Sequence, residues 1–337
     1  MRQRAGSSTL GKTSTIDPEQ SLLEVAVYYY EQRLTQEEIA KRINTSRSTI
    51  SRMLDEARDR GIVQIKINYP WQRDQALEQQ LVAQFGLREA RVLIGRQRPE
   101  DEIRHGMGLQ AAHLIDSIVK DGQILGVSYG RSVASTIAAL EPKRKVGLTV
   151  VPVIGATGSD NPSIDGPDLV RRFATAYGGE YRQLPVPLLV ENMQTRDALV
   201  QMSKIHEILN LAKRADIVLL GVGAVAPQSP SAIWKGFLDE RYLSRIKDQG
   251  AVGHICGQFF DSRGQILDIE VNRRIIGIGT QGLSRIETVI AVASGKSKSE
   301  AIRGALRGKH LTVLVTDDET ATAILDLDGT QREIPPK

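Results

Sequence analysis

The chain has 337 residues, 41% of them hydrophobic and 25% charged, with a formal net charge of +4. This composition is typical of a globular protein of about two domains and excludes a disordered or fibrous chain. The single cysteine, Cys256, excludes an internal disulfide and a cysteine-rich metal site. No apolar run approaches the ~20 residues of a membrane span, and the polar N-terminus is unlike a secretory signal. We therefore expect a cytoplasmic protein.

The first elements form a small N-terminal domain. Residues 1–16 are polar and are expected to be a flexible tail, and residues 17–70 follow as a helical domain. Asp17 could cap the first helix, with Pro18 at its first position. At the end of this domain, in "GIVQIKINYP" (61–70), Ile62, Gln64 and Lys66 alternate with Val63, Ile65 and Ile67. This period of two predicts a strand.

The stretch "TQEEIAKRINTSRSTISRML" (35–54) predicts two short helices joined by a tight turn. Thr35 and Glu38 have the spacing of a capping box, and Ser46 can cap the second helix. Asn44 lies in the turn, where a positive φ is expected and asparagine tolerates it. The small Ala40 lies where the two helices would cross. This arrangement predicts a helix-turn-helix.

The early turns of the second helix carry hydroxyls and two guanidiniums, which suit base edges and phosphates in a major groove. The alternative is an ordinary helical hairpin with solvated charges. Thr45 departs from the pattern, since that turn position usually carries an aliphatic residue. The residues expected to contact DNA are Thr35, Gln36, Ser46, Arg47, Ser48, Thr49, Ser51 and Arg52.

The remainder of the chain is predicted to be a second domain, residues 88–337, reached through a linking helix at 71–87. Leu77, Leu81, Val82 and Phe85 share a face of that helix, and Gly86 would end it. This face either packs on the domain or forms an oligomer contact.

Short β-branched runs alternate with helical patterns from residue 88 onward. The alternation predicts an α/β, Rossmann-like fold with a mostly parallel sheet covered on both faces. The predicted strands are "ARVLIG" (90–95), "QILGVSYG" (123–130), "LTVVPVIGATG" (148–158), "DIVLLGVGAV" (216–225), "ETVIAVASG" (287–295) and "LTVLVTD" (311–317). The predicted helices are 103–120, 131–140, 165–177, 195–214 and 297–308.

The N-terminal stretch "VAVYYYEQRLTQEEIAKRINTSRSTISRMLDEARDRGIVQIKI" resembles the DNA-binding module of the SorC family of sugar-binding transcriptional regulators. "ILGVSYGRSV", "VVPVIGATGS", "DIVLLGVGAV", "GAVGHICGQFFDSRG" and "GKSKSEAIRGALRGKHLTVLVTDDETATAIL" are similar to later blocks of that family, in order. The resemblance implies an effector domain like that of sugar-phosphate isomerases, a phosphorylated sugar or polyol as effector, a homodimer or homotetramer, and repression of a carbohydrate operon through double-stranded operator DNA.

Glycine turns that follow the predicted strands are the candidate effector loops. Ligands of open parallel sheets bind at the carboxyl ends of strands, where helix N-termini offer free N–H groups. Glycine turns of this kind are also common without a ligand. The candidate residues in these loops are Ser128, Tyr129, Gly130, Arg131, Ser132, Gly155, Thr157, Gly158, Gly221 and Gly223.

Two further candidates are Lys298 and His254. Lys298 lies near a predicted helix N-terminus, where a cation opposes the helix dipole unless an anion is bound. By its position in the family it is the preferred phosphate ligand, although it could be a solvated lysine. His254 stands where the family block usually has an acidic residue. It could contact the sugar, or it could be structural.

Two other classes of protein are the alternatives. The first is a sugar-phosphate isomerase-like or deaminase-like enzyme that carries a DNA-binding module. Asp261, Asp268, Glu270 and Asp317 are its possible acid–base groups, although none lies in a recognisable isomerase motif. The second is a scaffold whose N-terminal hairpin binds proteins. The histidines lack metal-ligand spacing with one another or with Cys256, so we expect no metal. We also expect no cofactor and no catalytic residue.

Overall fold

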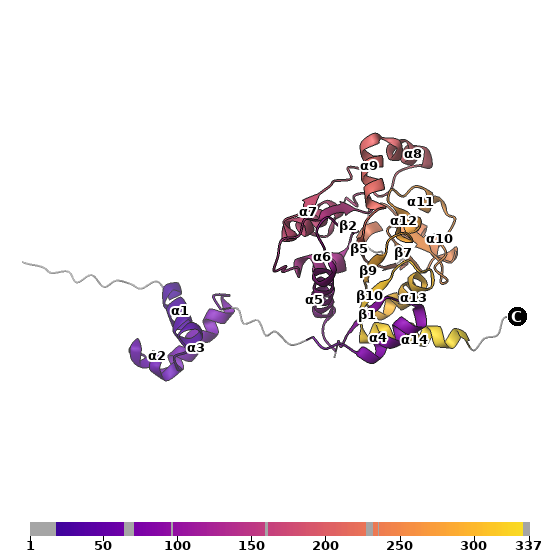
Figure 1. The fold of residues 1–337 in the computed structure, drawn as a ribbon. Helices are drawn as coiled ribbons and strands as arrows, with labels where there is room; N and C mark the ends of the chain where they lie inside the picture. Colours follow the sequence, from indigo (N-terminus) through magenta and orange to yellow (C-terminus); the bar gives the residue numbers. More distant parts are fainter. Residues whose placement is uncertain are drawn as a thin grey trace, which may run out of the picture. The chain divides into compact units, whose positions relative to one another are not determined.

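The structure is a computed structural model that describes residues 18–63, 71–95, 97–158, 161–226, 232–234 and 236–332. The chain forms two compact units, Met1–Pro70 and Trp71–Lys337 (Figure 1). The expected tail at 1–16 and the capping residue Asp17 lie outside the described residues.

Helices α1 (Pro18–Ala26), α2 (Gln36–Arg42) and α3 (Arg47–Asp59) form the small unit, with a π-helical turn η1 (Val27–Glu31) after α1. Their core consists of Val25, Ile39, Ala40, Ile50 and Leu54, all buried. The core residues of α2 and α3 recur at helical spacing, so the sequence folds into a helix-turn-helix that is preceded by one supporting helix.

The first three residues of the strand predicted at 61–70 are not in a strand. Gly61–Val63 form a turn and a bend rather than a strand, and residues 64–70 lie outside the described part of the chain. The Val63 N–H donates to the Ala57 carbonyl at 3.0 Å, so the chain folds back on the end of α3 at this point.

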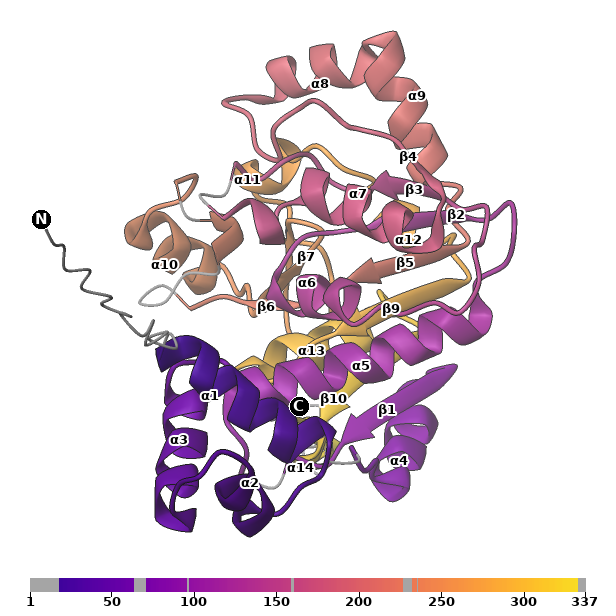
Figure 2. The same cartoon turned by 90° about the vertical axis from the view of Figure 1, so that its left-hand side faces the viewer.

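The larger unit is built on a seven-stranded sheet of order β1-β10-β9-β5-β2-β3-β4, in which every pairing is parallel (Figures 1 and 2). The prediction of a mostly parallel sheet is confirmed. Its strands are β1 (Glu89–Leu93), β2 (Ile124–Val127), β3 (Thr149–Pro152), β4 (Glu180–Tyr181), β5 (Ile217–Leu220), β9 (Thr288–Val292) and β10 (Val313–Asp317).

Helices cover both faces of this sheet, because alternate residues of a strand point to opposite sides. Ile217 and Leu219 of β5 join one hydrophobic cluster, while Val218 and Leu220 join another. The first cluster is closed by α5 (Glu100–Ile118), α6 (Arg131–Ala138) and α7 (Gly166–Tyr177). The second is closed by α4 (Gln75–Phe85), α9 (Ser203–Ala212), α13 (Ser299–Arg307) and α14 (Asp318–Arg332).

A second sheet, absent from the sequence-based prediction, has three antiparallel strands in the order β6-β7-β8. They are β6 (Gly223–Ala224), β7 (Gly253–Ile255) and β8 (Gln258–Phe260). The helix predicted at 195–214 is two helices, α8 (Met193–Gln201) and α9, divided at Met202. The remaining elements are α10 (Glu240–Asp248), α11 (Glu270–Arg273), α12 (Gly279–Leu283), and the short 3-10 turns η2 (Pro162–Ile164), η3 (Ala232–Trp234) and η4 (Lys296–Lys298).

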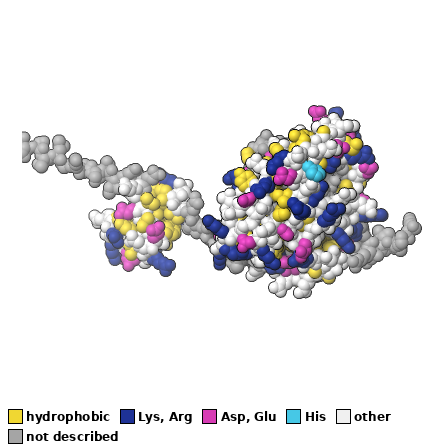
Figure 3. All heavy atoms as spheres, turned by 45° about the horizontal axis from the view of Figure 1, so that its top comes forward, with side chains coloured by type: hydrophobic (Ala, Val, Ile, Leu, Met, Phe, Trp, Pro, Cys, Tyr) yellow, Lys and Arg dark blue, Asp and Glu magenta, His cyan; other side chains and the backbone are white. Residues whose placement is uncertain are grey.

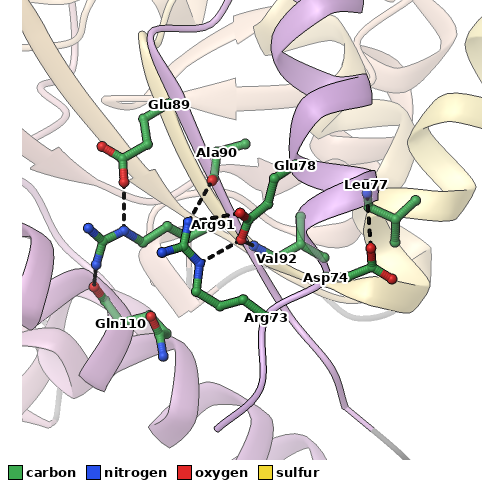
Figure 4. A network of polar contacts seen from close by, with 9 residues as sticks. All are labelled: Arg73, Asp74, Leu77, Glu78, Glu89, Ala90, Arg91, Val92 and Gln110. Carbon is green, nitrogen blue, oxygen red and sulfur yellow. Dashed lines mark hydrogen bonds and ion pairs between the residues drawn. The ribbon is translucent and has the colours of Figure 1, made fainter.

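The larger unit begins with an extended segment that pairs with β1 before α4 starts. The Asp74 N–H donates to the Val92 carbonyl at 2.8 Å, and the Ile94 N–H donates to the Gln72 carbonyl at 2.9 Å. The buried Glu78 carboxylate accepts two hydrogen bonds from the Arg73 guanidinium and one from the Val92 N–H (Figure 4). The start of this unit is therefore fixed to the sheet at its β1 edge.

Charged side chains of both signs are interspersed over the visible face of the larger unit (Figure 3). That face therefore presents no continuous basic surface to a polyanion. None of the helices within the described ranges combines the length and apolar content needed to cross a bilayer.

Candidate nucleic-acid interface and effector site

The geometry of the helix-turn-helix follows its local sequence. The Thr35 hydroxyl accepts from the Glu38 N–H at 3.3 Å, and the Glu38 carboxylate accepts from the Thr35 N–H at 2.8 Å. Asn44 has φ 54°, and the Ser46 hydroxyl accepts from the Thr49 N–H at 3.1 Å. The predicted capping box, turn and cap are thus all present.

The early turns of α3 present the predicted contact residues to solvent. Ile50, Leu54 and Ala57 form its buried face, whereas Arg47 and Arg52 are exposed. Neither arginine forms an ion pair with any of the described residues, so both are available to phosphates.

The other side chains of α3 and α2 are more engaged. Further along α3, Arg58 pairs with Asp55 and Arg60 pairs with Glu56. Ser48 and Thr49 hydroxyls also contact the Ser46 hydroxyl, each at 2.8 Å, which leaves them accessible but partly engaged. Ser51 and Gln36 are half-buried.

In the larger unit the sheet order defines where a ligand can bind. From β2 the chain proceeds to β3 and β4 on one side, and from β5 it proceeds to β9 and β10 on the other. Strands β2 and β5 are neighbours, so their carboxyl ends form the topological switch point of the sheet. Open parallel sheets bind ligands in the crevice at this point.

The loop after β2 places Ser128 and Arg131 at the switch point. The buried Ser128 donates its N–H to the Leu219 carbonyl of β5 at 3.0 Å. Gly130 has φ +126°, a conformation that side-chain-bearing residues rarely adopt, and it starts α6 at Arg131. Tyr129 is buried in the core below this loop, and Ser132 follows in the first turn of α6.

The loop after β5 meets the ends of both neighbouring strands. A Cβ added at Gly221 would lie 3.9 Å from the Val292 carbonyl and 4.0 Å from the Tyr129 carbonyl. Gly223 pairs with His254 across β6 and β7, and a Cβ at Gly223 would lie only 2.1 Å from His254 Nε2. Glycine at 223 is therefore what admits the imidazole of His254.

The His254 ring is enclosed by aromatic residues. Its centroid lies 5.2 Å from the Trp234 ring and 5.6 Å from the Phe259 ring, both in edge-on orientation. Burial, together with the nearby Lys298 charge, lowers the pKa of His254 to about 3, so the ring is neutral. Within the described residues, neither His254 Nε2 nor Trp234 Nε1 has a hydrogen-bond partner. Buried polar groups without a partner are rare in folded proteins, so these two nitrogens are candidates for contact with a ligand.

Lys298 lies in the segment after β9, close enough to Arg131 of the loop after β2 to feel its charge. It ends η4 and precedes α13, and it is half-buried. Burial is the main cause of its lowered pKa, and the charges of Arg131 and Arg104 lower the pKa further, while Glu100 opposes them. In the described structure its ammonium forms no ion pair. The site therefore has an excess of positive charge that an anion would neutralise.

In the loop after β3, Thr157 and Gly155 have structural contacts within the protein, whereas Gly158 lines a pocket. The Thr157 hydroxyl donates to the Asp165 carboxylate at 2.8 Å, and Gly155 is glycine because the Pro187 carbonyl lies 2.4 Å from where a Cβ would be. Gly158 has φ +63° and lines an open pocket of about 390 Å³ together with Ala156, Pro185, Pro187 and Phe237. The Gly130 N–H donates to the Ile164 carbonyl at 3.3 Å, which ties this loop to the one after β2.

The carboxylates considered for an enzyme have local structural partners. Asp261 accepts from the Arg263 and Gln265 N–H groups, and Asp317 accepts from Thr320. The other two form ion pairs, Asp268 with Arg273 and Glu270 with Arg274. Among the described residues, no three His, Cys, Asp or Glu side chains gather as a metal site requires.

Three residues near the switch point were missed in the sequence. Glu100 lies 3.7 Å from Arg131, and Arg104 forms ion pairs with Glu100 and Asp101 at the start of α5. The positions of Glu100 and Arg104 after the strand predicted at 90–95 could have indicated them, because a helix that follows a parallel strand begins at the carboxyl edge of the sheet. Trp234 carried no such signal, since it precedes no strand or glycine turn of the predicted sheet.

Comparison with protein families gives two matches. The family model described as a putative sugar-binding domain matches residues 69–326, and a Crp-like helix-turn-helix domain matches residues 20–71. The first covers most of the larger unit and includes every candidate effector residue. The second covers most of α1 and all of α2 and α3.

Two regulators of known name and one crystal structure are similar to this chain over nearly its whole length. The deoxyribonucleoside regulator of Bacillus subtilis is 33% identical over 310 residues, 92% of this chain and 98% of that protein. The sorbitol operon regulator of Klebsiella pneumoniae is 33% identical over 307 residues, 90% of this chain and 97% of that protein. The crystal structure of the full-length sorbitol operon regulator SorC from K. pneumoniae has a TM-score of 0.72 and 31% identity, covering 92% of this chain and all of that chain.

Proposed function

Because this chain belongs to the SorC family of sugar-binding transcriptional regulators, we propose that it represses a carbohydrate operon and responds to a phosphorylated sugar or polyol. The effector binds at the carboxyl edge of the parallel sheet. Its binding changes the affinity of the helix-turn-helix for an operator. Coupling of ~1–3 kcal/mol would give a response of roughly 5- to 150-fold.

The observation that carries the phosphate assignment is the set of charges around Lys298. Three cations, Lys298, Arg131 and Arg104, lie near two carboxylates, Glu100 and Asp101, and both of these carboxylates pair with Arg104. The N-terminus of α6 adds its free N–H groups at Arg131 and Ser132. A phosphate dianion would accept from these donors and raise the pKa of Lys298, because it would offset the charges of Arg131 and Arg104. The loops around Gly221, Gly223, Thr157 and Gly158 and the ring of His254 would enclose the sugar.

The test compares sorbitol with sorbitol 6-phosphate, and glucose with glucose 6-phosphate, by calorimetry and thermal shift. We expect binding only of phosphorylated compounds, and Lys298→Met should weaken it at least tenfold. Lys296→Met is the matched control, because this lysine is exposed in the same turn. Equal binding of the free sugars, or equal effects of the two substitutions, would contradict the phosphate assignment.

DNA recognition is assigned to the exposed early turns of α3. The full chain would first select a duplex from a random-sequence pool, and Arg47→Ala should then weaken binding of that duplex by about 1–3 kcal/mol. Arg60→Ala is the control, because Arg60 already pairs with Glu56 at the far end of the helix. Failure of the unchanged chain to enrich any duplex would contradict DNA recognition.

A homodimer or homotetramer is part of this proposal. Two copies would place two α3 helices on half-sites about one helical turn, or a multiple, apart. Leu23 and Tyr30 of the small unit and Met193 and Met202 of the larger one are large apolar side chains left exposed. Light scattering coupled to size-exclusion chromatography measures the oligomeric state directly. A monomer at micromolar concentration would contradict the proposed oligomer.

A further inference from the structure

The helix α14 is anchored at its start to the candidate phosphate loop. The Gly295 N–H, just before η4 and Lys298, donates to the Thr320 hydroxyl at 2.8 Å. The Thr320 hydroxyl in turn donates to Asp317 Oδ2 at 2.7 Å, and its N–H donates to Asp317 Oδ1 at 2.9 Å. Both side chains are buried, so buried hydrogen bonds join the loop to the first turn of α14, where Asp318 also accepts from the Gly95 N–H at 2.9 Å.

The same helix is anchored two turns later to α4. The buried Asp328 carboxylate accepts from the Gln84 amide of α4 and, at 2.8 Å, from the Arg307 guanidinium of α13. The buried Arg303 of α13 donates to the Leu327 carbonyl at 2.7 Å. With 1.5 Å rise per residue, Thr320 and Asp328 are separated by roughly 12 Å along the helix.

Helix α4 is in turn fixed to the segment through which the chain leaves for the small unit. Glu78 of α4 binds Arg73 through both carboxylate oxygens, at 2.7 and 2.8 Å, and also accepts from the Val92 N–H (Figure 4). Asp74 caps α4 by accepting from the Leu77 N–H at 3.0 Å. A displacement of α4 therefore moves residues 71–74 with it.

We propose that α14 couples the effector loop to α4, with Thr320 as its contact to the loop, Asp328 as its contact to α4 and Gln84 as the receiving residue. These three residues then set the size of the effector response while touching neither the effector nor DNA. This inference rests on the proposed function, because it needs both an effector at Lys298 and a DNA-binding readout.

The polar contacts of α14 favour coupled movement with its neighbours over packing alone. Purely apolar contacts let helices slide and repack, whereas buried charged hydrogen bonds fix one register. Here the attachment points at the two ends of α14 are polar, while Ala321 and Ile324 between them are buried in the shared core. A helix held in this way moves as a rigid body when one end is displaced.

The test uses the full chain with sorbitol 6-phosphate, glucose 6-phosphate and 2-deoxyribose 5-phosphate as effectors and the selected duplex as DNA. Gln84→Met keeps the length of the side chain and removes its hydrogen bond, and Gln80→Met is the matched control on the exposed face of α4. Thr320→Val is the second variant and Thr322→Val its exposed control. Three quantities are measured: effector affinity, DNA affinity alone, and the ratio of DNA affinities with and without effector.

For Gln84→Met we expect effector affinity and DNA affinity alone within threefold of the unchanged chain, and a response ratio reduced at least threefold. Thr320→Val should reduce the ratio as well, whereas both control variants should keep it. An unchanged ratio in both Gln84→Met and Thr320→Val would overturn the coupling role, as would an equal loss in the controls. If the unchanged chain shows no response to any of the three effectors, the proposed function fails, and the inference fails with it.

Discussion

The neutral, buried His254 makes the stability of the larger unit depend on pH. Its folded pKa of about 3 lies below the ordinary value of 6.5, because burial and the charge of Lys298 disfavour the imidazolium. Between these two pH values the unfolded chain binds a proton that the folded chain does not. Stability is therefore fully present above pH 6.5 and is lost as pH falls from 6.5 towards 3.

The magnitude follows from the width of that window. Each pH unit within this window lowers the free energy of unfolding by about 1.4 kcal/mol. Lowering the pH from 7.5 to 5 therefore lowers it by about 2 kcal/mol through His254 alone. His254→Gln removes the group and should remove that share of the pH dependence, whatever the substitution does to stability at pH 7.5.

The assay is urea unfolding at pH 7.5 and 5, followed by tryptophan fluorescence, since Trp71 and Trp234 both lie in the larger unit. His206→Gln is the matched control, because this imidazole is exposed on α9. The control should lose as much stability as the unchanged chain, and His254→Gln about 2 kcal/mol less. Equal losses in all three proteins would refute the account of a buried neutral imidazole.

Three further substitutions test individual contacts. Ser46→Ala removes the cap of α3 and should destabilise it by about 1 kcal/mol, so amide exchange in α3 should accelerate roughly fivefold; unchanged exchange would contradict the cap. Gly223→Ala places a Cβ against the His254 ring and should cost about 1–3 kcal/mol in thermal unfolding, unless His254→Ala is made as well. Glu78→Gln leaves Arg73 without its carboxylate and should cost about 1–3 kcal/mol in urea unfolding; a neutral effect would show that the paired segment is held by backbone bonds alone.

The elements that could be predicted from sequence are those whose signals are local. The capping box at Thr35, the cap at Ser46 and the positive φ at Asn44 depend on residues within a few positions of one another. The six runs predicted as strands are long and rich in β-branched residues, because both faces of a parallel sheet are buried. Each of them contains a strand of the seven-stranded sheet.

The elements that were missed depend on tertiary packing. The helix predicted at 195–214 divides at Met202, because α9 buries Ile205 and Ile208 in a separate cluster while α8 buries no residue. No glycine or proline marks this break. The strands β6, β7 and β8 have only two or three residues each, too few for a periodic pattern to be read.

The candidate site was only partly predictable for the same reason. Each loop could be recognised from its glycines, but the proximity of Lys298, Arg131 and His254 depends on the order of β9, β5 and β2 in the sheet. Sequence alone also could not separate Gly155, whose absent side chain makes room for the Pro187 carbonyl, from glycines that border open space.

The three-stranded sheet lies wholly within the connection between β5 and β9, which are adjacent in the large sheet. Its residues Ile255, Phe259 and Phe260 are nevertheless buried in the same core cluster as Ala301 and Ile302 of α13. Exchanging residues 223–260 between relatives would therefore also require compatible residues on α13, because a Cβ added at Gly253 would lie 2.6 Å from the Cβ of Ala301.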